Sequence, residues 1–484
     1  MKKFFKTDTF LYFIFFGTCI FVLLQSPLSP FAKSINGVDS SVFIYSAQQI
    51  LDGQLMYKDI VDHKGPFLYF INAIALSIFG GNFIGIWIFE VLSLFVASIM
   101  MYKTARFFAG KVSSSFAVIT CILFLVRLLV GGNLTEEWAL PYISIALYIF
   151  VAYLKENKPL NIVRLLVLSL TFVFTFMLQA NLVAMWAGFG IIMFIKWIVE
   201  KKYNELIRSL SLILLFVLFS LLPFFLYFYC KGTLSDAIYL VFKFNMFEYD
   251  SSSALKIGFN ILQWSEDHLG IIPVIIVIFM FLREKTMING GVLLAFIFTA
   301  VACSLGAHFA HYFMLFAPLL VIPYAYSLEI IKESFPKRKY VYLFIIFIFY
   351  NYSIIETQAK AIYDNYSEKA YGLYAMSTST MEKLKEVIEQ NTQNTDKILV
   401  KGSQVSIYLY SDRVCATRFP FPLLGSSLAK KHYVKDAANA LPKLIMQGKL
   451  VNSWDDYNLD ILLNDKYELI ETDIENVEIW KLKE

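Results

Sequence analysis

Long apolar runs separated by short polar segments make up the first 356 residues of the chain. A helix that crosses the hydrocarbon core of a bilayer needs about 20 predominantly apolar residues. Eleven runs approach this length, and the pattern therefore predicts eleven membrane-spanning helices. They are expected at 8–25, 84–102, 114–130, 139–154, 163–179, 182–199, 209–229, 269–282, 289–305, 312–331 and 340–356.

A twelfth apolar segment, FLYFINAIALSIF at 67–79, is too short to be counted with them. At about 1.5 Å per residue it covers about 20 Å of a hydrocarbon core that is roughly 30 Å thick. With eleven spans and a cytoplasmic N-terminus, the inner segments hold nineteen lysines and arginines and the outer loops hold six. A span at 67–79 would reverse every later loop against the positive-inside rule. We therefore predict a helix that lies at the outer interface.

The composition agrees with a membrane protein. The chain is 58% hydrophobic and only 17% charged, with a mean hydropathy of +0.60, whereas soluble domains are about 25% charged. No A-x-A-like cleavage site follows the first apolar run, so we interpret it as an uncleaved span. The five cysteines show no spacing typical of a disulfide framework or a zinc site, and no metal site is predicted.

The last 128 residues differ in composition, because they hold 34 of the chain's 80 charged residues. Helix-like stretches near 378–391 and 435–447 alternate there with the strand-like stretches KILVK, YELIET and VEIWKLK. The sequence therefore predicts two domains: an all-α membrane domain at 1–356 and a small extracytoplasmic α/β domain at 357–484. We expect a multi-pass protein of the cell membrane with this second domain outside.

The first outer loop, residues 26–83, carries a candidate functional acid. Apolar residues between Val42 and Leu51 have helical spacing, and Gly53 ends the predicted helix. Asp39 or Ser40 is expected at the N-cap, a role worth about 1 kcal/mol. A structural cap and a catalytic carboxylate are both compatible with Asp39.

A second acidic site, Glu136 and Glu137, opens the fourth predicted span. These acids could simply favour the positive end of the helix dipole. Acids at a bilayer surface are costly, however, which indicates a function. Arg127 ends the preceding span and needs an anionic partner, such as either glutamate or a bound phosphate, unless its side chain reaches the interface by itself.

The remaining polar candidates also fall on the predicted outer side. Histidines and lysines that converge with acids at one interface are typical of a site for an anionic lipid head group. The candidates for donor-phosphate or acceptor binding are Asp59, Asp62, His63, Lys64, Arg127, His308, His311 and Tyr312.

The segment YKDIVDHKGPFLYFINA (57–73) resembles integral-membrane glycosyltransferases of the GT-C fold. The likeness is to bacterial relatives of the protein O-mannosyltransferases and of the lipid A aminoarabinose transferase, which are similar to glycosyltransferase family 39. NLTEEW (133–138) and HYFMLFAP (311–318) are also similar to segments of these enzymes. With the expected topology, the resemblance covers essentially the whole chain.

The resemblance implies a polyprenyl-phosphate-linked sugar as donor and an extracytoplasmic acceptor, such as a cell-envelope glycan, a teichoic acid or a lipid-linked saccharide. It implies Asp39 as general base and Glu136 or Glu137 as a second catalytic acid. The O-mannosyltransferases carry an acidic pair where this chain has Asp39-Ser40, which disfavours a protein acceptor. No cofactor is implied, a divalent cation stays open, and no nucleic-acid partner is expected.

Three other functions compete with this interpretation. A transporter or flippase should show inverted repeats and helices broken at the midplane, and the sequence shows neither. A polysaccharide polymerase or ligase with a diphosphate donor is disfavoured by the separate outer domain and the first-loop acid. A non-catalytic protein whose outer domain binds a partner would not need acids at the interface.

Overall fold

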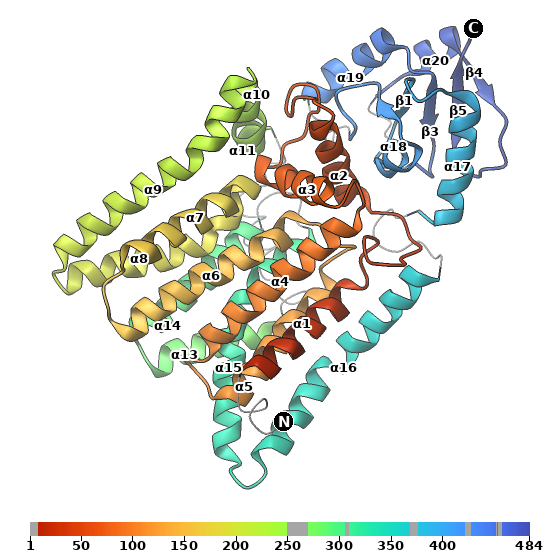
Figure 1. The fold of residues 1–484 in the computed structure, drawn as a ribbon. Coiled ribbons are helices and arrows are strands. Elements are labelled where there is room, and N and C mark those ends of the chain that lie inside the picture. Colours follow the sequence, from red (N-terminus) through yellow and green to blue (C-terminus); the bar gives the residue numbers. More distant parts are fainter. Residues whose placement is uncertain are drawn as a thin grey trace.

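The computed structural model describes residues 8–248, 270–304, 309–367, 376–421, 427–451, 453 and 457–484. A bundle of helices forms one part of the molecule and a small domain with a sheet forms the other (Figure 1). The elements of the bundle are α1 (Thr9–Leu23), α2 (Val38–Leu51), α3 (Pro66–Ile78), α4 (Ile84–Ala105), α5 (Lys111–Phe124), η2 (Leu125–Arg127), α6 (Thr135–Glu156), α7 (Ile162–Leu178), η3 (Ala180–Val183), α8 (Ala184–Val199), α9 (Tyr203–Cys230), α10 (Leu234–Ile238), the π-helix η4 (Tyr239–Phe244), α11 (Asn245–Phe247), α13 (Ile271–Arg283), α14 (Met287–Cys303), η6 (Ala310–Leu315), α15 (Phe316–Ser334) and α16 (Lys339–Tyr366).

A helix occupies each of the eleven apolar runs that the sequence pattern singled out. Six helical segments within the described residues are long and apolar enough to cross a bilayer: α4, α6, η3 with α8, α9, η6 with α15, and α16. Shorter apolar helices occupy four of the other five runs and the segment of α3, and the fifth run, 114–130, holds α5. The chain is therefore a multi-pass membrane protein built mainly of helices, while the number of spans and the side on which each terminus lies stay predictions.

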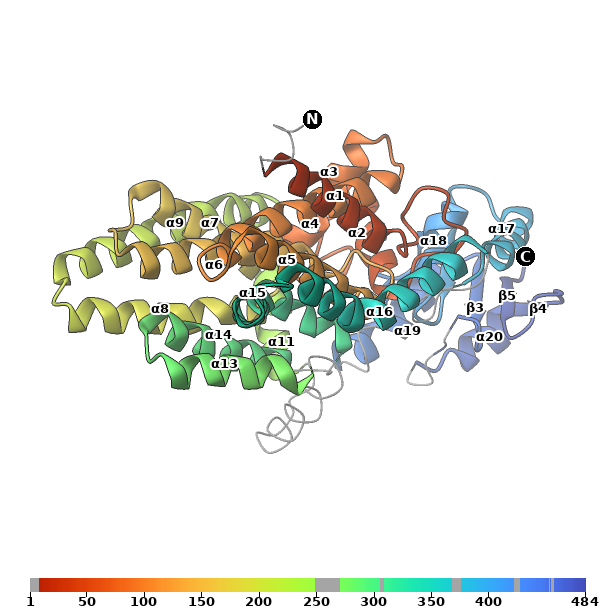
Figure 2. The same ribbon diagram turned by 90° about the horizontal axis from the view of Figure 1, so that it is seen from below.

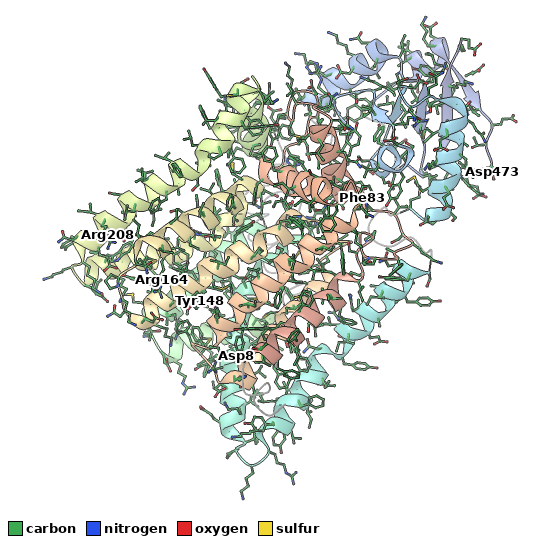
Figure 3. All side chains as sticks on the ribbon, viewed as in Figure 1. Asp8, Phe83, Tyr148, Arg164, Arg208 and Asp473 are labelled. Atoms are coloured by element: carbon green, nitrogen blue, oxygen red, sulfur yellow. The ribbon has the colours of Figure 1, made fainter. Side chains whose placement is uncertain are left out.

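The two ends of the bundle differ in character. Arg164 and Arg208 lie at the end remote from the C-terminal domain, where Asp8 also binds Lys111 (Oδ1–Nζ 3.0 Å) (Figure 3). The helices α2, α3 and α10 lie at the opposite end, near the C-terminal domain (Figure 1). The view from below shows the same division along the length of the molecule (Figure 2). The polar loops that carry the candidate site residues are consequently gathered at one end.

The first outer loop folds as two short helices that pack on each other and on the bundle. α2 contacts α3, and α3 contacts both α4 and α7. The helix predicted between Val42 and Leu51 is confirmed, and Gly53 follows it with a φ of +92°, a backbone conformation that favours glycine. The segment predicted as an interfacial helix is α3, with Pro66 as its first residue.

The C-terminal domain is built around a five-stranded sheet in the order β2-β1-β3-β5-β4. β1, β2 and β3 are parallel, and β5 runs antiparallel to both β3 and β4. The elements are α17 (Thr378–Asn391), β1 (Lys397–Val400), α18 (Ser406–Ser411), β2 (Val414–Cys415), α19 (Ser427–Ala440), β3 (Leu444–Gln447), α20 (Asp460–Lys466), β4 (Tyr467–Ile470) and β5 (Glu478–Leu482).

The predicted α/β character of this domain is confirmed, with one element assigned wrongly. The helix predicted at 435–447 ends at Ala440, and its second part is the buried strand β3. A short buried parallel strand has a continuous apolar pattern that periodicity cannot distinguish from a helix. The helix α16 continues through residue 357 to Tyr366, so the chain enters the second domain without a break at the boundary placed after residue 356.

Candidate functional site

The loop that enters α3 is fixed to the bundle by close backbone contact. The Gly65 N–H donates to the Leu178 carbonyl oxygen at 2.9 Å. A Cβ built on Gly65 would lie 2.0 Å from the Met177 carbonyl oxygen, so only glycine fits against the end of α7. This contact sets the position of the two residues before it, His63 and Lys64.

His63 is held by the segment that follows α9. Its Nδ1 lies 2.6 Å from Oδ1 of Asn245, and the Asn245 amide donates to the His63 carbonyl oxygen at 2.9 Å. Because that amide also donates to the Val241 carbonyl, its oxygen faces the ring and Nδ1 is the donor. Burial lowers the pKa of His63, and the nearby charges of Asp62 and Asp39 partly oppose this effect. The histidine is therefore a neutral ring of fixed tautomer near physiological pH.

Asp62 and Lys64 flank this histidine in different environments. Asp62 is buried, and its carboxylate accepts hydrogen bonds from the Tyr69 hydroxyl and the His63 N–H, both at 2.7 Å. Lys64 is half-buried, and its ammonium donates to Oε1 of Gln179 at 2.9 Å. An ammonium with a neutral partner keeps its full charge for an anion. Asp62 therefore orders the loop, while Lys64 is available to a ligand.

Asp39 lies in the first turn of α2, but it is not the N-cap that the sequence pattern predicted. Gly37 is the N-cap residue of α2, and no side chain caps this helix. The Asp39 side chain is exposed, and it acts electrostatically on His63. The prediction failed because a helix can begin with glycine at the N-cap. Asp39 therefore does not have the capping role that its position in the sequence allowed.

A strained turn joins η2 to α6 beside this helix. Val130, Gly131, Gly132 and Asn133 all have positive φ values, of 45°, 101°, 87° and 56°. A positive φ is unusual for a β-branched residue such as Val130, and it costs about 1–3 kcal/mol. The Asn133 side chain donates to Ser40 of α2 at 3.2 Å and to Asn72 of α3 at 3.0 Å, and it accepts from the Trp138 indole at 2.9 Å. The turn thus connects α2 to α3 and α6.

Glu90 of α4 is a further member of this site that our sequence analysis did not include. It is fully buried, accepts a short hydrogen bond from the Asn133 N–H, and adjoins the carboxyl group of Glu137. A lone acid within the apolar run 84–102 was the available signal, since ionisable residues inside membrane helices usually have a function. Asn245 and Gln179 gave no such signal, because neutral amides in loops are common.

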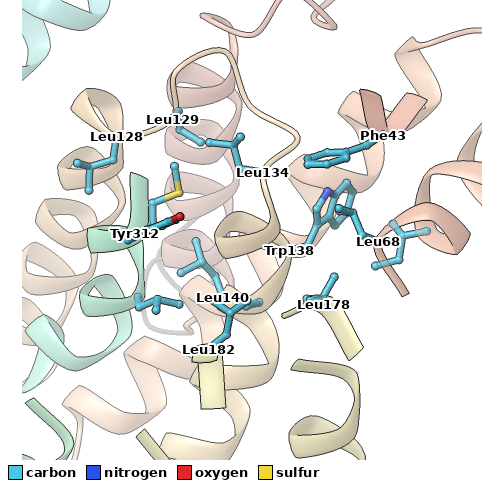
Figure 4. Packing of buried hydrophobic residues seen from close by; sticks show 14 of the residues in the cluster. Phe43, Leu68, Leu128, Leu129, Leu134, Trp138, Leu140, Leu178, Leu182 and Tyr312 are labelled. Carbon is cyan, nitrogen blue, oxygen red and sulfur yellow. The ribbon is translucent and has the colours of Figure 1, made fainter. Parts of the chain in front are cut away.

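Glu136, like Glu137, lies in the first turn of α6, and its side chain faces His311 of η6. Neither of its oxygens has a hydrogen-bond partner among the described residues, and both are buried. Nε2 of His311 lies 3.9 Å from Glu136 Oε2. Tyr312 is buried next to this pair in a predominantly apolar shell that includes Leu129, Leu134 and Leu140 (Figure 4). The structure therefore joins His311 and Glu136, which are far apart in the sequence.

Two of the other predicted residues, Arg127 and Asp59, do not join this group. Arg127 is exposed and donates to the Ser353 hydroxyl of α16 at 2.9 Å, and no ion pair within the described part of the chain links it to Glu136 or Glu137. Asp59 is exposed and accepts from the Leu55 N–H at 2.9 Å. His308 lies outside the described residues.

A cleft of about 610 Å³ lies between the first outer loop and the C-terminal domain. The Val61 N–H donates to the Arg418 carbonyl oxygen at 2.7 Å and joins the two parts beside it. Lys58, Gln49 and Lys397 line the cleft, and neither lysine has an acidic partner among the described residues. Gln49 is a buried polar residue in the same lining. We name this space the interdomain cleft.

Comparison with protein families gives a match over more than half of the chain. A family model described as the competence-induced protein Ccs4 N-terminal domain matches residues 2–339. The chain belongs to the competence-induced protein Ccs4 family. No curated protein matches the chain in sequence.

The fold of this Ccs4-family chain is similar to solved structures of membrane transferases. ArnT from Cupriavidus metallidurans bound to undecaprenyl phosphate matches with a TM-score of 0.64 at 12% identity, over 97% of each chain. The Archaeoglobus fulgidus oligosaccharyltransferase, tethered to an acceptor peptide, matches with a TM-score of 0.58 at 11% identity, over 100% of this chain and 75% of that one. The GT-C-like fold expected from the sequence is confirmed.

The site of this Ccs4-family chain offers complementary chemical groups around one point. Asp39 is an exposed carboxylate that can accept a proton. Lys64 is a half-buried cation that has no acidic partner within the described part of the chain, and it can stabilise a developing negative charge. His63 is a neutral ring next to Lys64 in the chain. Among the described residues, no group of three or more His, Cys, Asp and Glu side chains is placed to hold a metal ion.

Proposed function

We propose that the chain is a glycosyltransferase that transfers a sugar from a polyprenyl-phosphate-linked donor to an acceptor outside the cytoplasmic membrane. The observation that carries this proposal is the convergence of Asp39, His63 and Lys64 at one end of the helical bundle, beside α3. The likeness to ArnT in complex with undecaprenyl phosphate supports a lipid-phosphate donor.

The reaction assigns one task to each charged group. The Asp39 carboxylate accepts the proton of an acceptor hydroxyl as the hydroxyl oxygen forms a bond to the anomeric carbon of the donor sugar. The bond between that carbon and the phosphate oxygen breaks, and its electron pair leaves with the polyprenyl phosphate. Lys64 stabilises this departing charge. A phosphate is already a good leaving group, so no strong general acid is needed.

The interdomain cleft is the proposed route for the acceptor. It is lined by Gln49, ten residues along α2 from Asp39, and a helix rises about 1.5 Å per residue, so about 15 Å separates the two. An acceptor that fills the cleft and reaches Asp39 is therefore longer than one sugar. Lys58, Lys397 and Arg418 give the lining three positive charges against the one negative charge of Asp59, which favours an anionic polymer, such as a phosphate-bearing envelope glycan, over a neutral one.

The test uses the purified full chain in lipid nanodiscs and undecaprenyl-phosphate-linked sugars with a radiolabelled sugar. Consumption of the donor is measured with and without envelope glycans that carry phosphate groups. We expect label to move to the glycan and the donor to be stable without it. Movement of unchanged donor across the bilayer without transfer would instead identify a flippase. Transfer that requires a diphosphate-linked donor would identify a polymerase or ligase.

A further inference from the structure

A second cleft lies in the C-terminal domain, away from the proposed transfer site. It has a volume of about 420 Å³, within the range of about 300–1,000 Å³ found for small-molecule sites. Polar side chains and one glycine make up its lining. We name it the switch-point cleft, and it is lined by Lys401, Gln447, Gly448, Ser453, Asn458, Asp460 and Glu478.

The topology of the sheet explains why a cleft forms at this point. Lys401 directly follows β1, and Gly448 directly follows β3, so the cleft lies at the carboxyl ends of two neighbouring parallel strands. The strand order β2-β1-β3 means that the chain moves from β1 to one side and then returns past it. With right-handed crossovers, the chain leaves the carboxyl end of β1 in one direction and the carboxyl end of β3 in the opposite direction. Open α/β sheets bind ligands in the crevice at such a reversal.

Lys401 gives the second, independent indication of a ligand. Only 8% of its surface is exposed, and the one hydrogen bond of its side chain among the described residues is a long one, 3.5 Å from Nζ to Oε1 of Gln447. A buried ammonium group is costly unless it is well paired. It has three protons to donate, so most of its capacity is unused inside the cleft.

The other lining groups supply both donors and acceptors. The Ser453 hydroxyl accepts from the Gly448 N–H at 2.6 Å, which leaves its proton free to donate. The Asn458 oxygen accepts from the Asp460 N–H at 2.7 Å, which leaves its amide free to donate. The Asp460 carboxylate lines the same space as an acceptor. Sugar hydroxyls both donate and accept, so this mixture of groups suits a saccharide.

The backbone next to the cleft disfavours a nucleotide. Phosphate cradles need free backbone N–H groups. The Lys401 N–H already donates to the Met446 carbonyl at 2.8 Å, and the Ser403 N–H donates to the Val451 carbonyl at 3.0 Å. Gly402 is paired with Ser453 in an isolated bridge. The turn after β1 therefore offers side chains, not a backbone cradle, to a ligand.

We propose that the switch-point cleft is a saccharide-binding site of the C-terminal domain, separate from the transfer site. Lys401 and Asn458 donate to hydroxyl oxygens of one sugar unit, and Asp460 accepts from its hydroxyl protons. This site would hold a glycan at a distance from the point of transfer. It does not depend on the proposed reaction, because its residues belong to a different part of the chain.

The experiment uses saturation-transfer NMR to detect binding of free sugars to the full chain in lipid nanodiscs. Four sugars are tested: glucose, galactose, mannose and N-acetylglucosamine. Nanodiscs are needed because sugar-based detergents would compete for the site. We expect a signal for at least one sugar. Asp460→Asn should weaken its binding about tenfold or more, since a site built to hydrogen-bond a sugar discriminates strongly against a lost partner. Lys401→Met should have a similar effect, because it keeps the apolar stem and removes the charge.

Two matched variants separate this effect from a general loss of structure. Asp465→Asn changes an exposed acid at the far end of α20, and Lys449→Met changes an exposed lysine beyond β3. Both should bind the sugar like the wild type. The Asp39→Asn variant should also bind it normally, whatever the result of the transfer assay. The proposal is overturned if none of the four sugars gives a signal, or if Asp460→Asn and Lys401→Met leave the signal unchanged.

Discussion

His311 and Glu136 form a buried pair in which Nε2 of the imidazole lies 3.9 Å from Oε2 of the carboxylate. The two residues come from η6 and from the first turn of α6, and both are at least nine-tenths buried. Neither oxygen of Glu136 has a hydrogen-bond partner among the described residues. A carboxylate kept in such a place costs stability, and a protein retains it when the charge has a function.

Glu136→Gln should therefore separate function from stability. The neutral amide is cheaper to bury than the carboxylate, so we expect the apparent melting temperature to stay within about 2 °C of wild type or to rise. Sugar transfer should fall about tenfold or more, because the charge is lost. Differential scanning fluorimetry and the transfer assay measure the two effects on the same sample. A variant that melts clearly lower and transfers normally would assign Glu136 to folding alone.

Asp39→Asn tests the proposed general base. Since Gly37 is the N-cap residue, the substitution alters no capping hydrogen bond and leaves the start of α2 intact. Loss of the proton acceptor should lower the rate of transfer by roughly 10²–10⁴-fold, with normal expression. Asp52→Asn at the other end of the same helix is the matched control and should be neutral. If Asp39→Asn keeps more than about a tenth of the wild-type rate, the base lies elsewhere, and Glu136 or Glu137 becomes the candidate.

Lys64 and Lys58 lie in one loop and should affect different substrates. Lys64→Ala removes the cation proposed to face the donor phosphate, so the Michaelis constant for the lipid donor should rise and turnover should fall. Lys58→Ala removes a charge from the interdomain cleft, so the Michaelis constant for an anionic acceptor should rise while that for the donor is unchanged. Steady-state kinetics with each substrate varied in turn measure this. Equal effects on both constants would show that the two lysines do not face separate substrates.

Much of the helical architecture could be predicted from the sequence, because long apolar runs and the Gly53 and Pro66 signals act locally. The bounds of α17 could also be predicted, because the periodicity of its sequence is a local signal. The site could be predicted only in part. Glu90 and Asn245 belong to the site through contacts with residues far apart from them in the chain. Arg127 donates a hydrogen bond to Ser353 of α16, which is also distant in the sequence. Such pairings depend on the packing of helices, which local patterns do not record.

His63 should make the protein sensitive to mild acid. Burial lowers its pKa in the folded protein, whereas an unfolded chain takes up a proton near pH 6.5. As the pH falls through that value the unfolded state gains a proton that the folded state does not bind, so stability decreases. His63→Gln should reduce the difference between melting temperatures at about pH 7.5 and about pH 5.5. His432→Gln, in α19, is the control and should keep the wild-type difference. An unchanged difference in His63→Gln would locate the acid sensitivity at another group.

Gly65 should tolerate no side chain, because it presses against the end of α7. An alanine Cβ there would lie 2.0 Å from the Met177 carbonyl oxygen, a backbone atom that can move only with its helix. Overpacking of this kind costs about 1–3 kcal/mol, and any shift of the loop also displaces His63 and Lys64. We therefore expect Gly65→Ala to lower the apparent melting temperature and to reduce transfer more than the stability loss explains. Gly17→Ala is the matched control, since a Cβ at Gly17 meets no atom within 4 Å, and it should be neutral in both assays. Wild-type melting and transfer in Gly65→Ala would mean that the loop is not held against α7 in the working protein.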